Sequence, residues 1–229
     1  MKKHAVATAL ALISAALSAS ASLVLTTDSF SNGTDTVPHA FTPSSTDLIN
    51  GLAATSVTGN FAQEGTGGTP VLTDGLFPSP ITRDAGGAFQ FSAFATGGNT
   101  GGTSLTYVLG SAKNIGSITI YGGWQDSGRD QQSYNILYST ASAPGTFLPL
   151  TTVNFQGDVT THPQLNRVTV SDTTGTLAGN VAALRFDFNA TENGYAGYAE
   201  IDVFAAVPEP GSLAMLGLAA LGAVTRRRR

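Results

Sequence analysis

The chain has 229 residues, with 11 Lys+Arg against 15 Asp+Glu and no cysteine. The lack of cysteine excludes disulfides, thiol redox chemistry and thiolate metal sites. Between Ser22 and Val207, five basic residues stand against 14 acidic ones, and this net charge of −9 disfavours binding to nucleic acid or anionic lipid. A charge of this sign suits neutral sugars or divalent cations, and it serves equally well to keep a protein soluble.

Residues 1–21 are expected to be a signal peptide. Lys2 and Lys3 form a short basic head, and Ala5–Leu17 is an apolar run of the length that such peptides carry. Ala19-Ser20-Ala21 fits a cleavage site between small residues, so the mature chain is predicted to begin at Ser22. The alternative is an uncut membrane anchor, which the shortness of the run disfavours.

Residues 22–206 are predicted to form one β-sandwich domain, since about 185 residues is the length of a single domain. Apolar and polar residues alternate at the strand period, and Gly, Pro and Asn separate the runs. The glycine-rich segment Gly97–Gly102 lacks the Lys-Ser/Thr ending of a phosphate-binding loop and is expected to be an ordinary loop. The expected strands are Leu23–Leu25, part of Gly51–Phe61, Phe89–Ala93, Leu105–Leu109, Ile115–Tyr121, Tyr134–Tyr138, Phe147–Phe155, Arg167–Val170, Val181–Phe188 and Ala199–Phe204.

The end of the chain has three parts in a fixed order. Two prolines, Pro208 and Pro210, flank Glu209 and favour an extended, unpaired backbone. The uncharged run Ser212–Val224 spans roughly 20 Å as a helix, less than the hydrocarbon core of about 30 Å. A small core helix with a basic tip is the alternative, which the absence of polar positions at helical spacing disfavours. Four terminal cations would hold this end on the cytoplasmic side of a membrane: Arg226, Arg227, Arg228 and Arg229.

This tail, Val207–Arg229, resembles the PEP-CTERM sorting signal of Gram-negative bacteria. The resemblance implies recognition by an exosortase, a membrane transpeptidase-like cysteine enzyme, with cleavage near the Pro-Glu-Pro triplet. It further implies a short transmembrane helix that anchors the protein transiently in the inner membrane. The mature protein is then expected on the outer cell surface or in an exopolysaccharide matrix.

Four motifs between Val71 and Phe204 resemble the discoidin-like, galactose-binding-like jelly roll. The third of them carries Gln132, Tyr134 and Ser139, and the second has Val108 where the family has Asp. The family's Thr-x-Trp after the early Asp-Gly turn is missing. The resemblance implies an antiparallel β-sandwich of the jelly-roll type. The four motifs are Leu72–Gly75, Leu105–Gly110, Arg129–Ser139 and Ala199–Phe204.

Some carbohydrate-binding relatives hold a structural ion between the early loop and the last strand. The resemblance therefore implies Asp74 and Glu200 as ligands of a calcium ion, and no other cofactor is expected. An ordinary Asp-Gly turn is the alternative for Asp74. For Glu200 the alternative is an ion pair with Arg129 or Arg185.

The loop Gly122–Arg129 is the candidate ligand patch. It holds the only tryptophan, Trp124, beside Gln125, Asp126 and Arg129, and a sugar can stack on an aromatic ring while its hydroxyls meet polar groups. Alternatively, Trp124 covers the end of the sandwich and Arg129 pairs with a carboxylate. Tyr195 and Tyr198 are expected near a loop end, with the same two interpretations.

The residues do not favour an enzyme. His39 and His162 do not form a metal-binding pair, there is no Gly-x-Ser-x-Gly elbow, and no two carboxylates stand out as a glycosidase pair. We expect a non-catalytic surface or matrix protein associated with exopolysaccharide. A lectin-like module with its site near Trp124 is the second hypothesis, and a polysaccharide-acting hydrolase is the third.

Overall fold

A single strand, β6 (Thr103–Gly123), takes part in both layers of the fold. Its first part pairs with β3 (Ser56–Thr58) and β10 (Ala178–Phe188), and its second part pairs with β11 (Tyr195–Ala205) and β9 (Leu165–Asp172). The sequence predicted two strands here, Leu105–Leu109 and Ile115–Tyr121. They are one strand because the backbone continues past a bulge and pairs with β10 again, with Val181 opposite Lys113 and Ala178 opposite Ile115.

The computed structural model describes residues 21–31, 33–34, 36–82, 91–98, 101–124, 128–157, 164–191 and 194–207. The expected signal peptide and the sorting tail from Pro208 onward lie outside the described residues, as do Gln125, Asp126 and His162. In the described part, no helix is long and apolar enough to cross a membrane.

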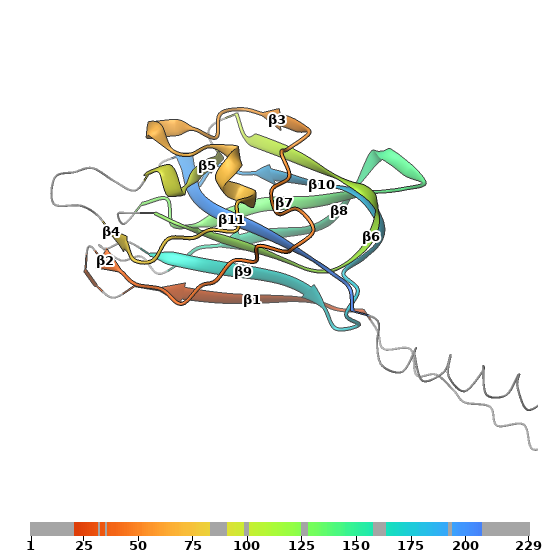
Figure 1. Ribbon diagram of the computed structural model, residues 1–229, viewed down its shortest axis with the longest axis horizontal. Helices are drawn as coiled ribbons and strands as arrows, with labels where there is room; N and C mark the ends of the chain where they lie inside the picture. Colours follow the sequence, from red (N-terminus) through yellow and green to blue (C-terminus); the bar gives the residue numbers. More distant parts are fainter. Residues whose placement is uncertain are drawn as a thin grey trace, which may run out of the picture.

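The strands form an antiparallel β-sandwich, as expected (Figure 1). One layer contains β3, the first part of β6, β10, β7 (Gln132–Thr140) and β8 (Ala143–Phe155). The other contains β5 (Ala95–Gly98), β11, the second part of β6, β9 and β1 (Leu23–Phe30). The remaining elements are β2 (Thr36–Val37), which pairs with β4 (Ile81–Thr82), and three 3₁₀ turns, η1 (Gln63–Gly65), η2 (Thr69–Thr73) and η3 (Phe91–Ala93).

Alternation along the strands separates the core from the surface. In β10, Leu184, Phe186 and Phe188 are buried, whereas Arg185 and Asp187 between them are partly exposed. Burial of each such apolar side chain contributes about 1.5–3 kcal/mol. A second apolar cluster joins the segment 36–82 to the second layer through Phe41, Phe77, Phe94, Tyr121, Trp124 and their neighbours.

Two expectations about the middle of the chain were wrong. Phe91–Ala93 form the 3₁₀ turn η3 and not the end of a strand; residues 83–90 are outside the described part. Gly97 and Gly98 belong to strand β5 and not to a loop. Gly97 is needed there for a close approach, because a Cβ on it would lie 2.6 Å from Cε2 of Tyr198 and 2.9 Å from Cγ of Phe188.

The two described ends of the chain lie at the same end of the sandwich (Figure 1). The carbonyl of Ser22 accepts a hydrogen bond from Thr173, just after β9, and the N–H of Ala206 donates to Asn114 in β6. This end is called the tail end below. The opposite end carries the start of β6 and the end of β10, where Thr103 and Phe188 pair.

Candidate functional site

The Asp-Gly turn after η2 meets the last strand. Asp74 ends η2, and its Oδ1 accepts a hydrogen bond from the N–H of Leu76 at 2.9 Å. Gly75 has a positive φ of 73°, which turns its N–H toward Glu200 Oε2 at 2.8 Å. The carboxyl groups of Asp74 and Glu200 lie close enough for the charge of Asp74 to raise the pKa of Glu200. The structure therefore brings together the two residues that the sequence suggested as calcium ligands.

Among the described residues, the Glu200 carboxyl has no basic partner, although it is buried. Its side chain is 0% exposed, and Oε1 has no hydrogen-bond partner. Burial, together with the charges of Asp202 and Asp74, raises the pKa of Glu200 to about 9, against the lowering effect of the hydrogen bond from Gly75. The two ion pairs expected as alternatives are not formed, because Arg129 pairs with Glu64 and Arg185 pairs with Asp187.

A third oxygen points to this turn. Asn50 Oδ1 is buried without a hydrogen-bond partner and lies 2.9 Å from the position of a Cβ on Gly75. We call Asn50, Asp74 and Glu200 the cradle. Among the described residues, no three His, Cys, Asp or Glu side chains form a metal-binding group by themselves. Two carboxylates and an amide nevertheless fit calcium, which takes such oxygens together with backbone carbonyls and water.

Two more carboxylates, those of Asp47 and Asp202, lie near the cradle. Asp202 Oδ2 accepts hydrogen bonds from the Ser44 N–H at 2.9 Å and from the Tyr121 hydroxyl at 3.2 Å. Asp47 Oδ1 accepts from the N–H groups of Ile49 and Val203. Burial raises the pKa of Asp202 to about 6. Neither residue was predicted from the sequence, although Asp202 follows Glu200 by two and therefore shares its side of the strand.

Trp124 covers one end of the core. Of the two roles expected for it from the sequence, this is the one without a stacked sugar. The Trp124 side chain is 2% exposed and lies between the rings of Phe91 and Phe94, with centroid distances of 5.6 and 5.4 Å. The guanidinium carbon of Arg129 lies 5.2 Å from the centroid of the Trp124 ring. A sugar could stack on this ring only after these groups moved aside. Tyr198 is likewise buried, in strand β11.

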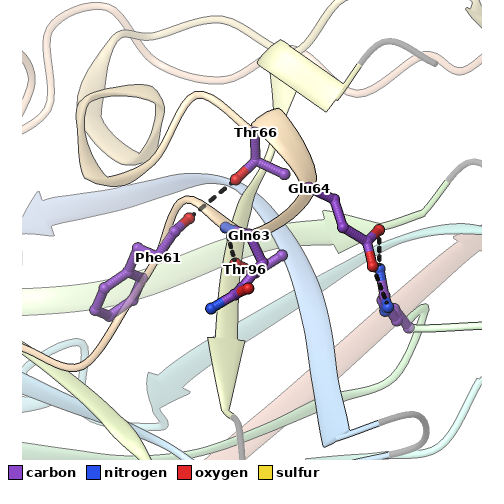
Figure 2. Close-up of polar contacts among 6 residues, drawn as sticks. Phe61, Gln63, Glu64, Thr66 and Thr96 are labelled. Carbon is purple, nitrogen blue, oxygen red and sulfur yellow. Dashed lines mark hydrogen bonds and ion pairs between the residues drawn. The ribbon is translucent and has the colours of Figure 1, made fainter. Parts of the chain in front are cut away.

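Arg129 is held by a bidentate ion pair. Its Nη1 and Nη2 donate to the two carboxylate oxygens of Glu64 at 2.5 and 2.7 Å, and this contact holds the pKa of Glu64 below its usual value. Figure 2 shows the turn that carries Glu64. Two hydrogen bonds hold this turn in place, one from the Thr66 hydroxyl to the Phe61 carbonyl and one from the Gln63 N–H to the Thr96 hydroxyl. The ring of Tyr195 lies 5.3 Å from the guanidinium.

A polar row crosses the outward face of the first layer. The strand registers place Ser104 of β6 opposite Asp187 of β10, and Asp187 opposite Asn135 of β7. Thr58 of β3 lies opposite Ser104, and Thr152 of β8 lies opposite Asn135 and donates to its Oδ1 at 2.7 Å. Opposed residues on adjacent strands share a face, so these five side chains form a continuous line of hydroxyl, amide and carboxylate groups.

All of this row except Thr152 lines a hollow of about 360 Å³, which we call the groove. Its other lining residues include Gly101, Gly102 and Asn189. Arg185 Nε donates to Asp187 Oδ1 at 2.6 Å, and Asn189 Nδ2 donates to Ser133 Oγ at 3.3 Å. The alternation in β10 was predicted from the sequence but the groove was not, since cross-strand register cannot be read from one strand at a time.

Comparison with known proteins accounts for the end of the chain. Residues 206–229 match the PEP-CTERM protein-sorting motif. The resemblance predicted from the tail is confirmed, and the motif marks the chain for export and exosortase processing. The roles of Pro208, Glu209, Pro210 and the four terminal arginines stay predictions. No curated protein matches the chain.

Several solved structures are similar to the described domain. The lectin domain of lectinolysin, complexed with Lewis B antigen, has 16% identity and a TM-score of 0.43, over 71% of this chain and 98% of that chain. A CBM32 domain produced by Clostridium perfringens has 14% identity and a TM-score of 0.40, over 70% and 99%. An F5/8 type C domain from Bacteroides fragilis has 17% identity and a TM-score of 0.35, over 48% and 69%.

Proposed function

We propose that the protein is exported, processed by an exosortase and kept as a non-catalytic component of the cell surface or exopolysaccharide matrix of a Gram-negative-type bacterium. Its domain binds a neutral glycan in the groove. The polar row across five strands is the observation that carries this proposal. The sorting motif at 206–229 supports the route to the surface.

The groove has the chemistry that sugar hydroxyls require. Each hydroxyl both donates and accepts, and the groove offers an acceptor in Asp187, a donor in Arg185 and groups of both kinds in Asn135 and Ser104. The ion pair between Arg185 and Asp187 leaves no net charge, which favours a neutral ligand over a uronate or a phosphate. Because the pair uses Nε of Arg185, its Nη groups remain for a ligand oxygen.

The position of the groove suits an anchored protein. Gly101, Gly102 and Asn189 lie beside the Thr103–Phe188 pair, at the end of the sandwich away from Ala206. The sorting tail follows Ala206 and would tie the tail end to the membrane before processing. The groove would then face away from the membrane, toward the surrounding polysaccharide.

The cradle is proposed to hold a structural calcium ion through Asn50, Asp74 and Glu200. The ion would supply positive charge to a carboxyl that the fold buries without a cation. It would also tie the turn after η2 to β11. In this proposal it takes no part in glycan binding, because the cradle and the groove share no residue.

A glycan array tests the proposal, with the full chain held in mild detergent. Binding to a neutral saccharide is expected, and the Asp187→Ala and Asn135→Ala variants are each expected to weaken it about tenfold to a hundredfold, the loss of one or two polar contacts of about 1.5–3 kcal/mol. Thr146→Ala, on the exposed part of β8, is the matched control and keeps full affinity. Glycan binding unchanged in both groove variants would contradict the site, and no binding at all would contradict the function.

The second hypothesis, a lectin-like site at Trp124, predicts a different result. Trp124→Phe would abolish binding if the indole stacked on the sugar, but would leave it unchanged if the glycan occupies the groove. We expect the second outcome, because the indole is buried against Phe91, Phe94 and Arg129.

A further inference from the structure

Strand β1 is an open edge of the second layer. In the described part of the chain it pairs only with β9, over all eight residues from Leu23 to Phe30. Leu23 and Leu25 are 47% and 46% exposed, although they share the side of the sheet on which Val168 and Val170 of β9 are buried. The edge therefore presents apolar side chains as well as backbone groups.

The backbone groups that point outward can be assigned from the register. Ser22 accepts a hydrogen bond from Thr173, its register partner, so alternate residues from Ser22 onward bond to β9. The N–H and C=O groups of the residues between them point away from β9. These are Leu23, Leu25, Thr27 and Ser29, which offer four donors and four acceptors along one line.

The other long edge of the sandwich is protected and this one is not. Strand β8 carries Pro144 and Pro149, and proline is a common device against edge-to-edge pairing. Strand β1 has no proline and no lysine. Its one charged side chain, Asp28, is occupied by an ion pair with Arg167. An exposed edge without such devices is a template for another strand.

We propose that β1 pairs antiparallel with β1 of a second copy of this chain. A two-fold axis at Thr26 sets Leu25 opposite Thr27 and Leu23 opposite Ser29 of the other copy. This register satisfies every outward N–H and C=O group of the strand at once. It also covers the exposed leucines of both copies, so the strand is complementary to itself in hydrogen bonds and in apolar surface.

The geometry of this pair has a consequence for anchoring. Each β1 begins at the tail end of its own copy (Figure 1). Antiparallel pairing therefore sets the two tail ends at opposite ends of the dimer. Two copies anchored in the same membrane cannot pair in this way. Pairing therefore follows release from the membrane, and the released dimer carries its two grooves at opposite ends, as a bridge between glycan strands.

A cysteine cross-link tests the pairing directly, because the chain has no cysteine of its own. In the full chain in mild detergent, Thr26→Cys sets two thiols opposite each other at the two-fold axis. Under mild oxidation we expect most of the protein to run as a disulfide-linked dimer. Thr146→Cys on the proline-containing edge is the control and is expected to stay monomeric. Equal cross-linking of both variants, or none at Thr26→Cys, overturns the proposal.

A second variant makes the test independent of the thiol. Leu25→Lys sets two ammonium groups near the axis while leaving the bonds to β9 in place. We expect the wild-type chain to sediment as a dimer at micromolar concentration and this variant as a folded monomer with an unchanged circular dichroism spectrum. A monomeric wild type, or a dimer unaffected by Leu25→Lys, overturns the pairing. Glycan binding by the monomeric variant is measured separately. That measurement tests the groove, whereas the sedimentation result tests only the pairing of β1.

Discussion

The backbone N–H of Gly75 donates a 2.8 Å hydrogen bond to the carboxylate of Glu200, and so joins an early turn to the last strand. The other oxygen of this carboxylate is buried without a partner. Oε2 of Glu200 thus connects two distant segments of the fold, whereas Oε1 lacks a hydrogen-bond partner. This asymmetry makes Glu200 the residue at which the calcium proposal and the stability of the domain are tested together.

Calcium is expected to raise the melting temperature. Binding to the folded state alone stabilises by about 2.7 kcal/mol at a concentration 100 times the dissociation constant. Glu200→Gln should lose this response, whereas Glu64→Gln, in the ion pair with Arg129, should keep it. Differential scanning fluorimetry with calcium and then with EDTA measures the effect. Identical melting curves of the wild type with calcium and with EDTA would contradict the proposal that the cradle binds a cation.

Without metal, the protein should lose stability as the pH rises. The pKa of Glu200 is about 9 in the folded state, above its usual value of 4.5, so folding favours the protonated carboxyl. Its stabilising contribution is present below pH 4.5 and disappears between pH 4.5 and about 9. Asp202 adds a smaller effect of the same sign up to about pH 6. Urea unfolding in EDTA at pH 5, 7 and 9 measures this trend, and a free energy of unfolding that increased across the series would contradict it.

Trp124→Ala should destabilise the domain by about 3–5 kcal/mol, the usual cost of removing a large buried aromatic side chain. The reason is its position between Phe91 and Phe94 in the second apolar cluster. Trp124→Phe should cost less, since it keeps an aromatic ring in that cluster. Chemical unfolding compares the three proteins. A folded Ala variant of unchanged stability would mean that Trp124 does not serve as a cover.

Gly197 should not tolerate a side chain. A Cβ on this residue would lie 2.2 Å from the carbonyl oxygen of Gly123 and 2.4 Å from Cε3 of Trp124. We expect Gly197→Ala to destabilise the fold by about 1–3 kcal/mol or more, the cost of overpacking a closed site. Gly145→Ala, with no atom within 4 Å, is the matched control and should be nearly neutral. Thermal melts of the two variants measure the difference.

The strands in the second half of the domain could be predicted because their alternation is strong, as in Val181–Phe188 within β10. The pairing of Asp74 with Glu200 could be suggested only through the family resemblance. Asn50, Asp47 and Asp202 were missed because their proximity depends on where a long, irregular segment folds back onto β11. The groove was missed for a related reason: its row exists only once five strands have taken their registers.

Because both layers contain part of β6, neither layer can separate from the other without bending or unpairing this one strand. The two layers are in this sense one folded sheet. Unfolding of one layer therefore exposes a strand edge of the other layer. The paired amide protons of the two parts of β6, Thr103–Val108 and Ile115–Gly123, should therefore exchange with solvent together, as one cooperative block, rather than in two steps that report on separate sheets.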